Sequence, residues 1–485
     1  MKRILPIPLT SPHRFLSSLS FIANGPLLAT AAGSNLESRR SCKRMNRGPR
    51  GGRQDDPQVL IRRYNRQRDM SESCRKWQRV STTSANDIRG PDDVPFTLMS
   101  YNILAQDLLE MHPDLYNNHD QAALSWAHRY DRLIAEINLV KPDILCLQEL
   151  QEDCKEQFAA GLENFNFEMI YKQRTGGMKT DGCAIFYRAD MFERINYQDV
   201  EFYQPHVEFL DRENVAIIVK LALKSNPSQT LVVATTHLLY NPRRQDVRLA
   251  QVQVLLAELD RLSFIGYYDN GKPKYAPTIV TGDFNLQPYS APYMLVTTGF
   301  LQYENLNRKT LEPCESRYEP PFGKTLLSPK LGITDDCRHE CLGNELDESY
   351  CNAVTRLHHS SQQPETPPPS PTSVSASKFG NGILRHQFQF TSAYRHNLDQ
   401  PDEEASTFQT QWITVDYLFY TRFHHPSKRR FIGGDLQLMA IYTLPTVFQA
   451  REIRNIPNMY FGSDHFSLAG KFLLKAPGGG CSSGS

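Results

Sequence analysis

Carboxylate, amide and imidazole side chains recur at the ends of apolar runs along this sequence. These residues are Asn102, Glu149, His237, Asp283, Asn285, Asp416, Asp464 and His465. Taken singly, each is explained equally well by a turn, since Asp and Asn close strands and a lone His often lies in a loop. The repetition of one design along the chain is what indicates a shared site.

This set of side chains suits the hydrolysis of a phosphodiester. The reaction needs a hard cation on the phosphate oxygens, and Glu149 is the natural principal ligand for Mg²⁺. The developing charge needs neutral or positive donors, which the amides of the set and a histidine supply. Asp283 suits the activation of a water, and Asp416 can pair with His465 and fix the tautomer of its ring.

Strands and helices that alternate along the chain must position these residues. Short apolar runs predict strands at 97–103, 143–147, 184–187, 215–221, 231–234, 277–280, 415–420 and 466–468. Apolar residues at helical spacing predict a helix around 130–137, which ends at Lys141-Pro142, and another over 249–262. This mixed order predicts an α+β fold in which two sheets pack together with helices outside.

Parts of the chain fall outside this pattern. Residues 1–80 contain 17 Lys and Arg against 5 Asp and Glu, and the pattern predicts a disordered basic leader over 1–93. Its first 36 residues lack acids and are similar to a mitochondrial presequence, although a leader without a targeting role is equally compatible. We also predict a largely disordered insertion over 309–405 in a catalytic domain spanning 94–474, and a disordered tail over 475–485.

The motifs at 100–102, 147–149, 236–237, 282–285, 415–417 and 463–465 resemble, in the same order, those of the exonuclease–endonuclease–phosphatase superfamily. The resemblance covers about 96–473, less the insertion. Within the superfamily, residues 99–106, 181–186 and 237–244 are similar to the deadenylase and nocturnin branch, and most closely to the Angel proteins.

The resemblance implies a four-layer α/β/β/α sandwich that acts on an RNA 3′ end with one or two Mg²⁺ ions, with Mn²⁺ tolerated. By matched position, Glu149 is a metal ligand, and Asp464 supports a second metal or the histidine. Asp283 aligns the nucleophile, and His465, oriented by Asp416, contacts the scissile phosphate. The remaining matched residues, which hold the phosphate or the metal shell, are Asn102, Asn285 and His237.

The resemblance also has departures, and they concern the substrate. Branch deadenylases clamp an adenine between a Pro and a Phe. Pro242 matches the former, but Gln411 stands at the latter position. Trp412, beside it, is therefore the aromatic candidate for contacting the substrate together with Pro242. Without that clamp a preference for poly(A) weakens, because stacking contributes about 1–3 kcal/mol per base. Further phosphate contacts are expected from Arg243 and Arg244 and from the basic loop 174–179, although a solvated loop explains the last equally well.

Three functions remain open at this point. The first is hydrolysis at RNA 3′ ends, either by a 3′–5′ exoribonuclease or by a 2′,3′-cyclic phosphatase, and Gln411 tilts the choice toward the phosphatase. The second is another phosphoester, such as an abasic DNA site, an inositol phosphate or sphingomyelin. The third is an inactive RNA-binding scaffold. No membrane partner is predicted, and the sequence shows neither the Leu-rich repeats that dock a deadenylase scaffold nor the peptide that binds the cap-binding initiation factor.

Overall fold

The computed structural model describes residues 69, 72–80, 92–268, 270–314, 320–340, 378–409, 411–422 and 436–476. All of them belong to the second of two units into which the chain divides, Pro57–Ser485. The presequence-like segment and nearly all of the tail lie outside the described residues, so the predictions made for them stay predictions. No helix in the described ranges is long and apolar enough to cross a bilayer.

The first sheet, as far as the structure describes it, has seven strands in the order β1-β18-β19-β2-β3-β5-β4. Their bounds are β1 Trp77–Arg79, β2 Val94–Asn102, β3 Ile144–Gln151, β4 Phe167–Gln173, β5 Asp181–Arg188, β18 Leu436–Tyr442 and β19 Leu468–Leu474. β2 and β3 are parallel, and the other pairings are antiparallel. The strand expected at 466–468 therefore begins only at Leu468.

The second sheet has six described strands in the order β14-β17-β11-β8-β7-β6. Their bounds are β6 Phe192–Glu201, β7 Val215–Leu223, β8 Asn226–His237, β11 Thr278–Asp283, β14 Phe390–Ser392 and β17 Asp416–Thr421. β8 and β11 are parallel, joined by a long helix. Three two-stranded ribbons complete the strands: β9 Phe264–Tyr267 with β10 Pro273–Tyr275, β12 Phe300–Gln302 with β13 Ile383–Arg385, and β15 Thr407–Phe408 with β16 Trp412–Ile413.

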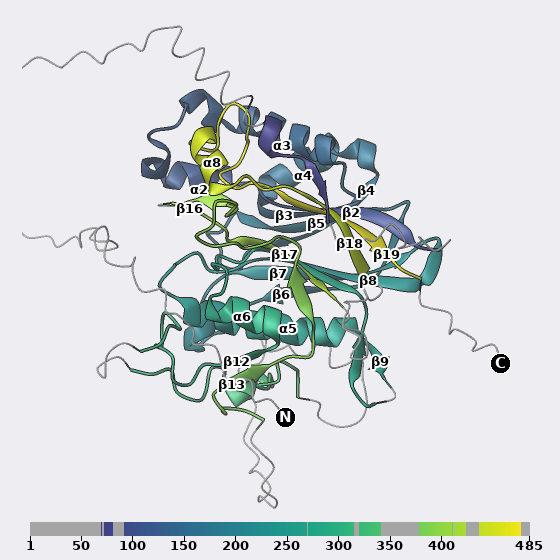
Figure 1. The fold of residues 1–485 in the computed structure, drawn as a ribbon, viewed down its shortest axis with the longest axis vertical. Coiled ribbons are helices and arrows are strands. Elements are labelled where there is room, and N and C mark those ends of the chain that lie inside the picture. The colour runs from purple at the N-terminus through teal and green to yellow at the C-terminus, as the bar shows by residue number, and fades with distance from the viewer. Residues whose placement is uncertain are drawn as a thin grey trace, which may run out of the picture. The chain divides into compact units, whose positions relative to one another are not determined.

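Helices cover the outer face of each sheet, so the layers run α/β/β/α (Figure 1). The first sheet is covered by α2 Gln106–Met111, α3 Trp126–Val140, α4 Lys155–Gly161 and α8 Val447–Ile453. The second sheet is covered by α5 Gln245–Ser263 and α6 Ala291–Thr298. The predicted four-layer sandwich is confirmed.

Side-chain alternation explains why both sheets are buried on two faces. In β7, Ile217 and Val219 pack between the sheets, whereas Ala216 and Ile218 pack toward α5. Neighbouring residues of a strand point to opposite faces, so a continuous apolar run fits a strand that is covered on both sides. The short apolar runs of the sequence therefore mark the buried central strands.

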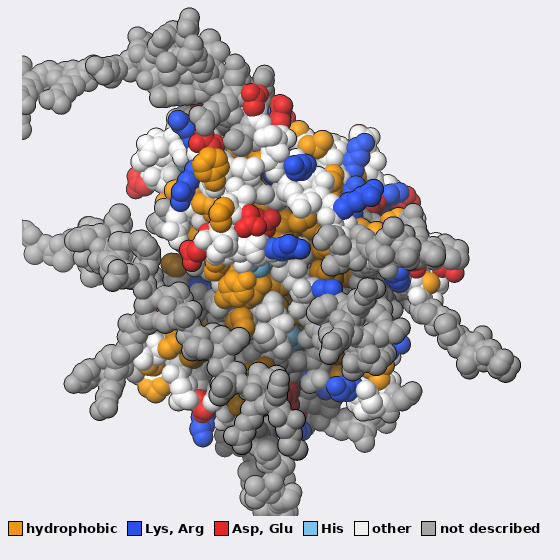
Figure 2. All heavy atoms as spheres, in the orientation of Figure 1, with side chains coloured by type: hydrophobic (Ala, Val, Ile, Leu, Met, Phe, Trp, Pro, Cys, Tyr) orange, Lys and Arg blue, Asp and Glu red, His pale blue; other side chains and the backbone are white. Residues whose placement is uncertain are grey.

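The described surface that the grey atoms leave open in Figure 2 does not form a basic face. Acidic and basic side chains are interspersed over the first helical layer, and hydrophobic side chains gather near the centre of the view. Attraction of a polyanion to this face must therefore rest on individual cations rather than on a broad positive field.

The predicted leader is wrong where it overlaps residues 72–80, because these residues join the fold. β1 pairs with β18, and Arg75 is 7 % exposed. The Arg75 guanidinium donates to the carbonyl of Thr443 at 2.5 Å and to the hydroxyl of Ser467 at 2.7 Å, and it pairs with Glu136 at 3.3 Å. The sequence hid this segment because a three-residue strand inside a basic stretch has no periodicity to detect.

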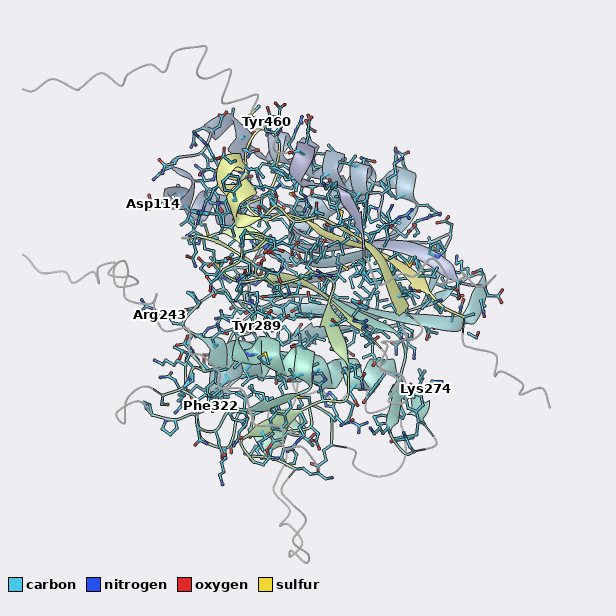
Figure 3. All side chains as sticks on the ribbon, in the orientation of Figure 1. Asp114, Arg243, Lys274, Tyr289, Phe322 and Tyr460 are labelled. Atoms are coloured by element: carbon cyan, nitrogen blue, oxygen red, sulfur yellow. The ribbon has the colours of Figure 1, made fainter. Side chains whose placement is uncertain are left out.

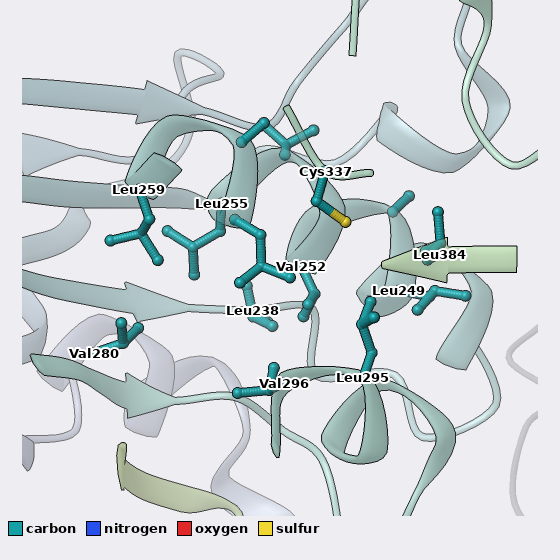
Figure 4. Close-up of a cluster of buried hydrophobic side chains, with 14 of the residues drawn as sticks. Leu238, Leu249, Val252, Leu255, Leu259, Val280, Leu295, Val296, Cys337 and Leu384 are labelled. Atoms are coloured by element: carbon teal, nitrogen blue, oxygen red, sulfur yellow. The ribbon is translucent and has the colours of Figure 1, made fainter. Parts of the chain in front are cut away.

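The predicted insertion over 309–405 is also wrong for its described residues. Residues 320–340 and 378–405 supply β13, β14 and core side chains. Figure 3 labels Phe322 beyond the α5 side of the second sheet, and Figure 4 shows Cys337 and Leu384 among the side chains of α5. Irregular loops that insert single apolar residues give no pattern in the sequence. The prediction of disorder is kept only for 315–319 and 341–377, which lie outside the described residues.

Candidate active site

The predicted residues meet at the edge where the two parallel strand pairs end. Asn102 pairs with Gln148 at the ends of β2 and β3, and His237 pairs with Asp283 at the ends of β8 and β11. Asp416 lies opposite Asp283 across the antiparallel pair β11 and β17. Parallel strands bring their carboxyl ends to one edge of a sheet, and the two sheets present these edges to each other.

Backbone irregularities aim two of the side chains. Glu149 has φ 61° and interrupts the register of β3 against β5, which makes it the extra residue of a bulge. Bulges re-aim side chains beside active sites, so the strand turns Glu149 toward the second sheet. Gly282 is required for another reason, since a Cβ there would lie 2.0 Å from the carbonyl oxygen of Thr236.

Asn102 links the acidic groups of both sheets. Its Nδ2 donates to Glu149 Oε1 at 2.9 Å and to Asp283 Oδ2 at 3.1 Å, and its Oδ1 accepts from the backbone N–H of Leu104 at 3.0 Å. The second oxygen of Glu149 accepts from the backbone N–H of Ala105 at 2.9 Å. The amide group of Asn102 therefore links Glu149 of β3 to Asp283 at the end of β11.

Asp283 lies between two histidines. His237 Nε2 is 3.5 Å from Asp283 Oδ2, and His465 Nε2 is 3.8 Å from the same oxygen. His465 Nδ1 lies 2.8 Å from Asp416 Oδ2 and donates to it. This hydrogen bond leaves Nε2 of His465 directed at the reacting centre, as predicted from the pairing of the two residue types.

Burial and neighbouring charges separate the protonation states of these groups. Burial, with repulsion from Asp416, raises the pKa of Asp283 to about 8. Burial, with repulsion from Asp464, also raises the pKa of Glu149. Burial alone would lower the pKa of His465, but the Asp416 carboxylate raises it well above its usual value. Burial, aided by Arg174, lowers the pKa of His237 to about 4, so His237 is neutral at pH 7 and His465 is the cation.

Asp464 is held from outside the predicted set. The hydroxyl of Tyr116 donates to Asp464 Oδ2 at 2.9 Å, and the carbonyl of Asp464 accepts from the Thr407 hydroxyl at 2.7 Å. Beneath this loop, the buried Arg129 donates to the carbonyls of Ile103, Leu104 and Gly462. No local pattern links Tyr116 to Asp464 across 348 positions, which is why the sequence did not show this contact.

The donor set fits a divalent cation. Among the described residues, the ion-pair partners of Glu149, Asp283 and Asp416 are histidines only. The buried Arg129 guanidinium interacts electrostatically with Asp464 and Glu149 without forming an ion pair with either. Asp283, Asp416 and His465 could share a metal, since their ligand atoms lie within 4.8 Å of one another. The hydrogen bond already joins the last two, however, and the oxygen donors of Glu149 and Asp464 suit a hard cation better.

The predicted substrate residues after His237 are only partly available. Pro242 and Arg243 are exposed, and Figure 3 labels Arg243 at the periphery of the molecule. Arg244 is committed to an ion pair with Asp246 at 2.9 Å. The buried Arg248 donates to the carbonyls of this turn, that of Pro242 included, at 3.1 Å. The turn is therefore held in place by Arg248. Of its two arginines, only Arg243 has no ion-pair partner among the described residues.

Asn285 is present at the site but directs its amide elsewhere. Its backbone N–H donates to Asp283 Oδ1 at 2.9 Å, and its Nδ2 donates to the carbonyl of Leu238 at 3.0 Å. Asn285 therefore ties the turn after β11 to the turn after β8 and orients the Asp283 carboxylate.

Trp412 is not available as a base clamp, and this prediction is wrong. Its ring is 8 % exposed and stacks on Phe466 with centroids 5.7 Å apart. Phe408, its partner across the β15–β16 ribbon, is 45 % exposed, and the neighbouring Thr407 forms a bridge with His465. Phe408 is therefore an exposed aromatic ring next to Thr407, the bridge partner of His465, and it stands eight residues before Asp416 rather than five.

Comparison with known proteins agrees with this geometry. The model of the "Endonuclease/Exonuclease/phosphatase family" matches residues 99–465. Protein angel homolog 2 from Bos taurus is 35 % identical over 395 residues, which is 78 % of this chain and 69 % of that protein. Protein angel homolog 1 from Homo sapiens is 32 % identical over 452 residues, which is 83 % of this chain and 67 % of that protein.

A solved structure extends the similarity to three dimensions. It is the crystal structure of ANGEL2, a 2′,3′-cyclic phosphatase, in complex with adenosine-2′,3′-vanadate. The match has a TM-score of 0.64 and 31 % identity, and it covers 83 % of this chain and 99 % of that one. The resemblance inferred from the motifs is thereby confirmed.

Proposed function

Because this chain belongs to the endonuclease/exonuclease/phosphatase family, we propose that it hydrolyses phosphoester bonds at RNA 3′ ends with Mg²⁺ as cofactor. The substrate we favour is a terminal 2′,3′-cyclic phosphate. The observation that carries the proposal is Asp283 Oδ2, which faces a neutral histidine at 3.5 Å and a cationic histidine at 3.8 Å. Asp283 as the base and His465 as the acid thus lie next to each other, with the neutral His237 on the other side of Asp283.

We assign the metal to Glu149, with Asp464 completing its oxygen donors. A divalent cation bound there would neutralise the phosphate oxygens and lower the pKa of the neighbouring carboxyl groups. Asn102 keeps Glu149 and Asp283 in register. Asp283, once ionised, accepts the proton of the attacking water. His465 donates from Nε2 to a phosphate oxygen, and the Asp416 carboxylate holds its ring and its charge.

The similarity to a solved 2′,3′-cyclic phosphatase supports the choice of substrate. A cyclic phosphate offers its strained ester at the chain end, so the site needs to hold the phosphate more than the base. The burial of Trp412 removes the residue that would have gripped an adenine from that side. Both observations favour removal of the cyclic phosphate over processive shortening.

A second candidate, a 3′–5′ exoribonuclease, draws on one different observation. Phe408 is exposed beside His465, and an exposed ring at that place could stack on a terminal base. The exposed Pro242 would then be its counterpart from the turn after β8.

Two labelled RNAs distinguish the candidates. One ends in oligo(A) with a 3′-hydroxyl and the other in a 2′,3′-cyclic phosphate, and each is incubated with the protein and Mg²⁺. Loss of the cyclic phosphate at constant chain length supports the proposal, whereas a ladder of shortened products supports the exoribonuclease. Absence of both products from the folded protein would contradict hydrolysis at RNA 3′ ends.

Glu149→Gln provides the control for this experiment. The substitution keeps the size of the side chain and one oxygen to accept from Ala105, but it removes the charge and the acceptor for Asn102. We therefore expect Mg²⁺-dependent turnover to be abolished while the protein stays folded. Full activity of Glu149→Gln would contradict the assignment of Glu149 as the principal metal ligand.

A further inference from the structure

Arg174 joins the two sheets beside the active site. Its Nη1 lies 3.4 Å from Asp181 Oδ1 at the start of β5, and its Nε donates to the carbonyl of Glu213 at 3.4 Å. Asp181 pairs with Gln151 of β3, two residues after Glu149, and Glu213 precedes Val215, which pairs with His237. The guanidinium therefore lies where the strand ends that carry Glu149 and His237 face each other.

Asp181 is built to hold this guanidinium. It is 1 % exposed, its Oδ1 contacts Arg174, and its Oδ2 is buried without a hydrogen-bond partner. The backbone N–H of Arg174 also donates to the carbonyl of Asp181 at 3.0 Å. A buried carboxylate is costly unless a cation compensates it, so Arg174 and Asp181 stabilise each other's position.

Arg174 keeps N–H donors that none of the described residues accepts. A guanidinium has five N–H groups, and the two contacts above are long for charged hydrogen bonds. The side chain is 15 % exposed, so its free edge is open. By contrast, Arg129 and Arg248 are fully buried and donate mainly to backbone carbonyls.

We propose that Arg174, oriented by Asp181, binds a phosphate oxygen of the substrate at the wall of the active site. This inference rests on the proposed phosphoester hydrolysis and adds a phosphate-binding residue to it, with Asp181 as its positioning residue. A planar guanidinium can hold Asp181 with one edge and a phosphate oxygen with the other, which an ammonium group at the same place cannot do.

Substitution of Arg174 tests the proposal. We expect Arg174→Met to lower kcat/KM for the cyclic-phosphate RNA roughly 10- to 100-fold, the usual loss for one charged hydrogen bond, and Arg174→Lys to recover only part of it. Arg188→Gln is the matched control, because Arg188 ends β5, the strand that begins at Asp181, and pairs with Asp143 and Asp190. We expect its kcat/KM to equal that of the wild type, and equal losses in both variants would overturn the proposal.

Binding of inorganic phosphate separates this inference from the proposed function. Calorimetry with Mg²⁺ present should show at least about tenfold weaker phosphate binding by Arg174→Met and no change in Arg188→Gln. Unchanged binding by Arg174→Met would overturn the assignment of Arg174. If the wild type cleaves neither RNA yet binds phosphate through Arg174, the proposed function fails and the phosphate site stands.

A double variant tests the role of Asp181. Arg174→Met leaves a buried carboxylate without its cation and could unfold the protein, whereas Arg174→Met with Asp181→Asn removes both charges. We expect Asp181→Asn to lower kcat/KM in the wild type but to have no further effect in Arg174→Met. An equal loss in both backgrounds would overturn the positioning role.

Discussion

At the scale of single residues, different neighbours give the two histidines of the site different protonation states. His237 is neutral because burial lowers its pKa to about 4, whereas His465 is charged because Asp416 accepts from its Nδ1. The roles therefore follow from neighbours rather than from residue type. The motif positions predicted which residues meet, but only the structure shows which histidine carries the proton.

We expect His465→Ala to lower kcat about 10²- to 10⁴-fold, because a positioned charged donor to the phosphate is lost. Single-turnover kinetics at saturating RNA would measure this loss. A variant with unchanged kcat would show that His465 does not act on the phosphate.

Asp416→Asn is the matched control for the charge of His465. Without that carboxylate the pKa of His465 falls, so the ring loses its proton at lower pH. We expect the alkaline limb of the pH–rate profile to move to lower pH in Asp416→Asn. An unchanged limb would contradict the inference that activity requires the His465 charge that Asp416 stabilises.

At the scale of elements, the fold could be predicted where local pattern and packing agree. The buried runs of β2, β3, β8 and β11 and the periodic faces of α3 and α5 gave the sandwich and the order of the site residues. The ribbon β15–β16 could not be predicted, since two-residue strands carry no periodicity. The sequence therefore indicates Trp412, rather than Phe408, as the aromatic residue that contacts the substrate.

The segment with β1 is an element that stabilises the catalytic loop. Arg75 contacts Ser467, two residues after His465, and its guanidinium lies 4.4 Å from the ring centroid of Tyr442. We expect Arg75→Met to lower the free energy of unfolding by about 3 kcal/mol, because the partly buried Glu136 and the carbonyl partners lose their donor. Chemical denaturation would measure this, with Arg79→Met as control, since Arg79 is exposed and lies in the same segment, 72–80. Equal stability of the two variants would show that the segment is dispensable.

At the scale of the whole molecule, the described core includes segments on both sides of residues 341–377. The stretch 359–377 is rich in Pro, Ser and Thr, so we expect its deletion to leave the melting temperature within about 2 °C of the wild type. Phe322→Ala provides the contrast, since Phe322 is 8 % exposed and packs against Tyr303 and Phe209. Its loss should cost about 3 kcal/mol. A large drop on deletion would show that the stretch is structured.

The register of β11 and β17 places Asp283 directly opposite Asp416, and this pair acts on the stability of the whole molecule. The pKa of Asp283 is raised to about 8 in the folded protein, so folding retains a proton that the unfolded chain releases above about pH 4. The stability from this group is therefore full below pH 4 and falls as the pH rises to 8. We expect Asp283→Asn to raise the free energy of unfolding of the metal-free protein at pH 8 by about 1–3 kcal/mol, and by less at pH 5. Thermal melts at both pH values would measure this, and a destabilised variant at pH 8 would contradict it.

It follows that thermal stability and catalytic activity favour different residues at position 283. A library screened only for resistance to heat would be enriched in proteins that fold well and have lost the carboxyl group of residue 283. The presence of Asp283 opposite Asp416 therefore indicates selection for activity, because a chain selected for folding alone would not retain this pair of carboxyl groups.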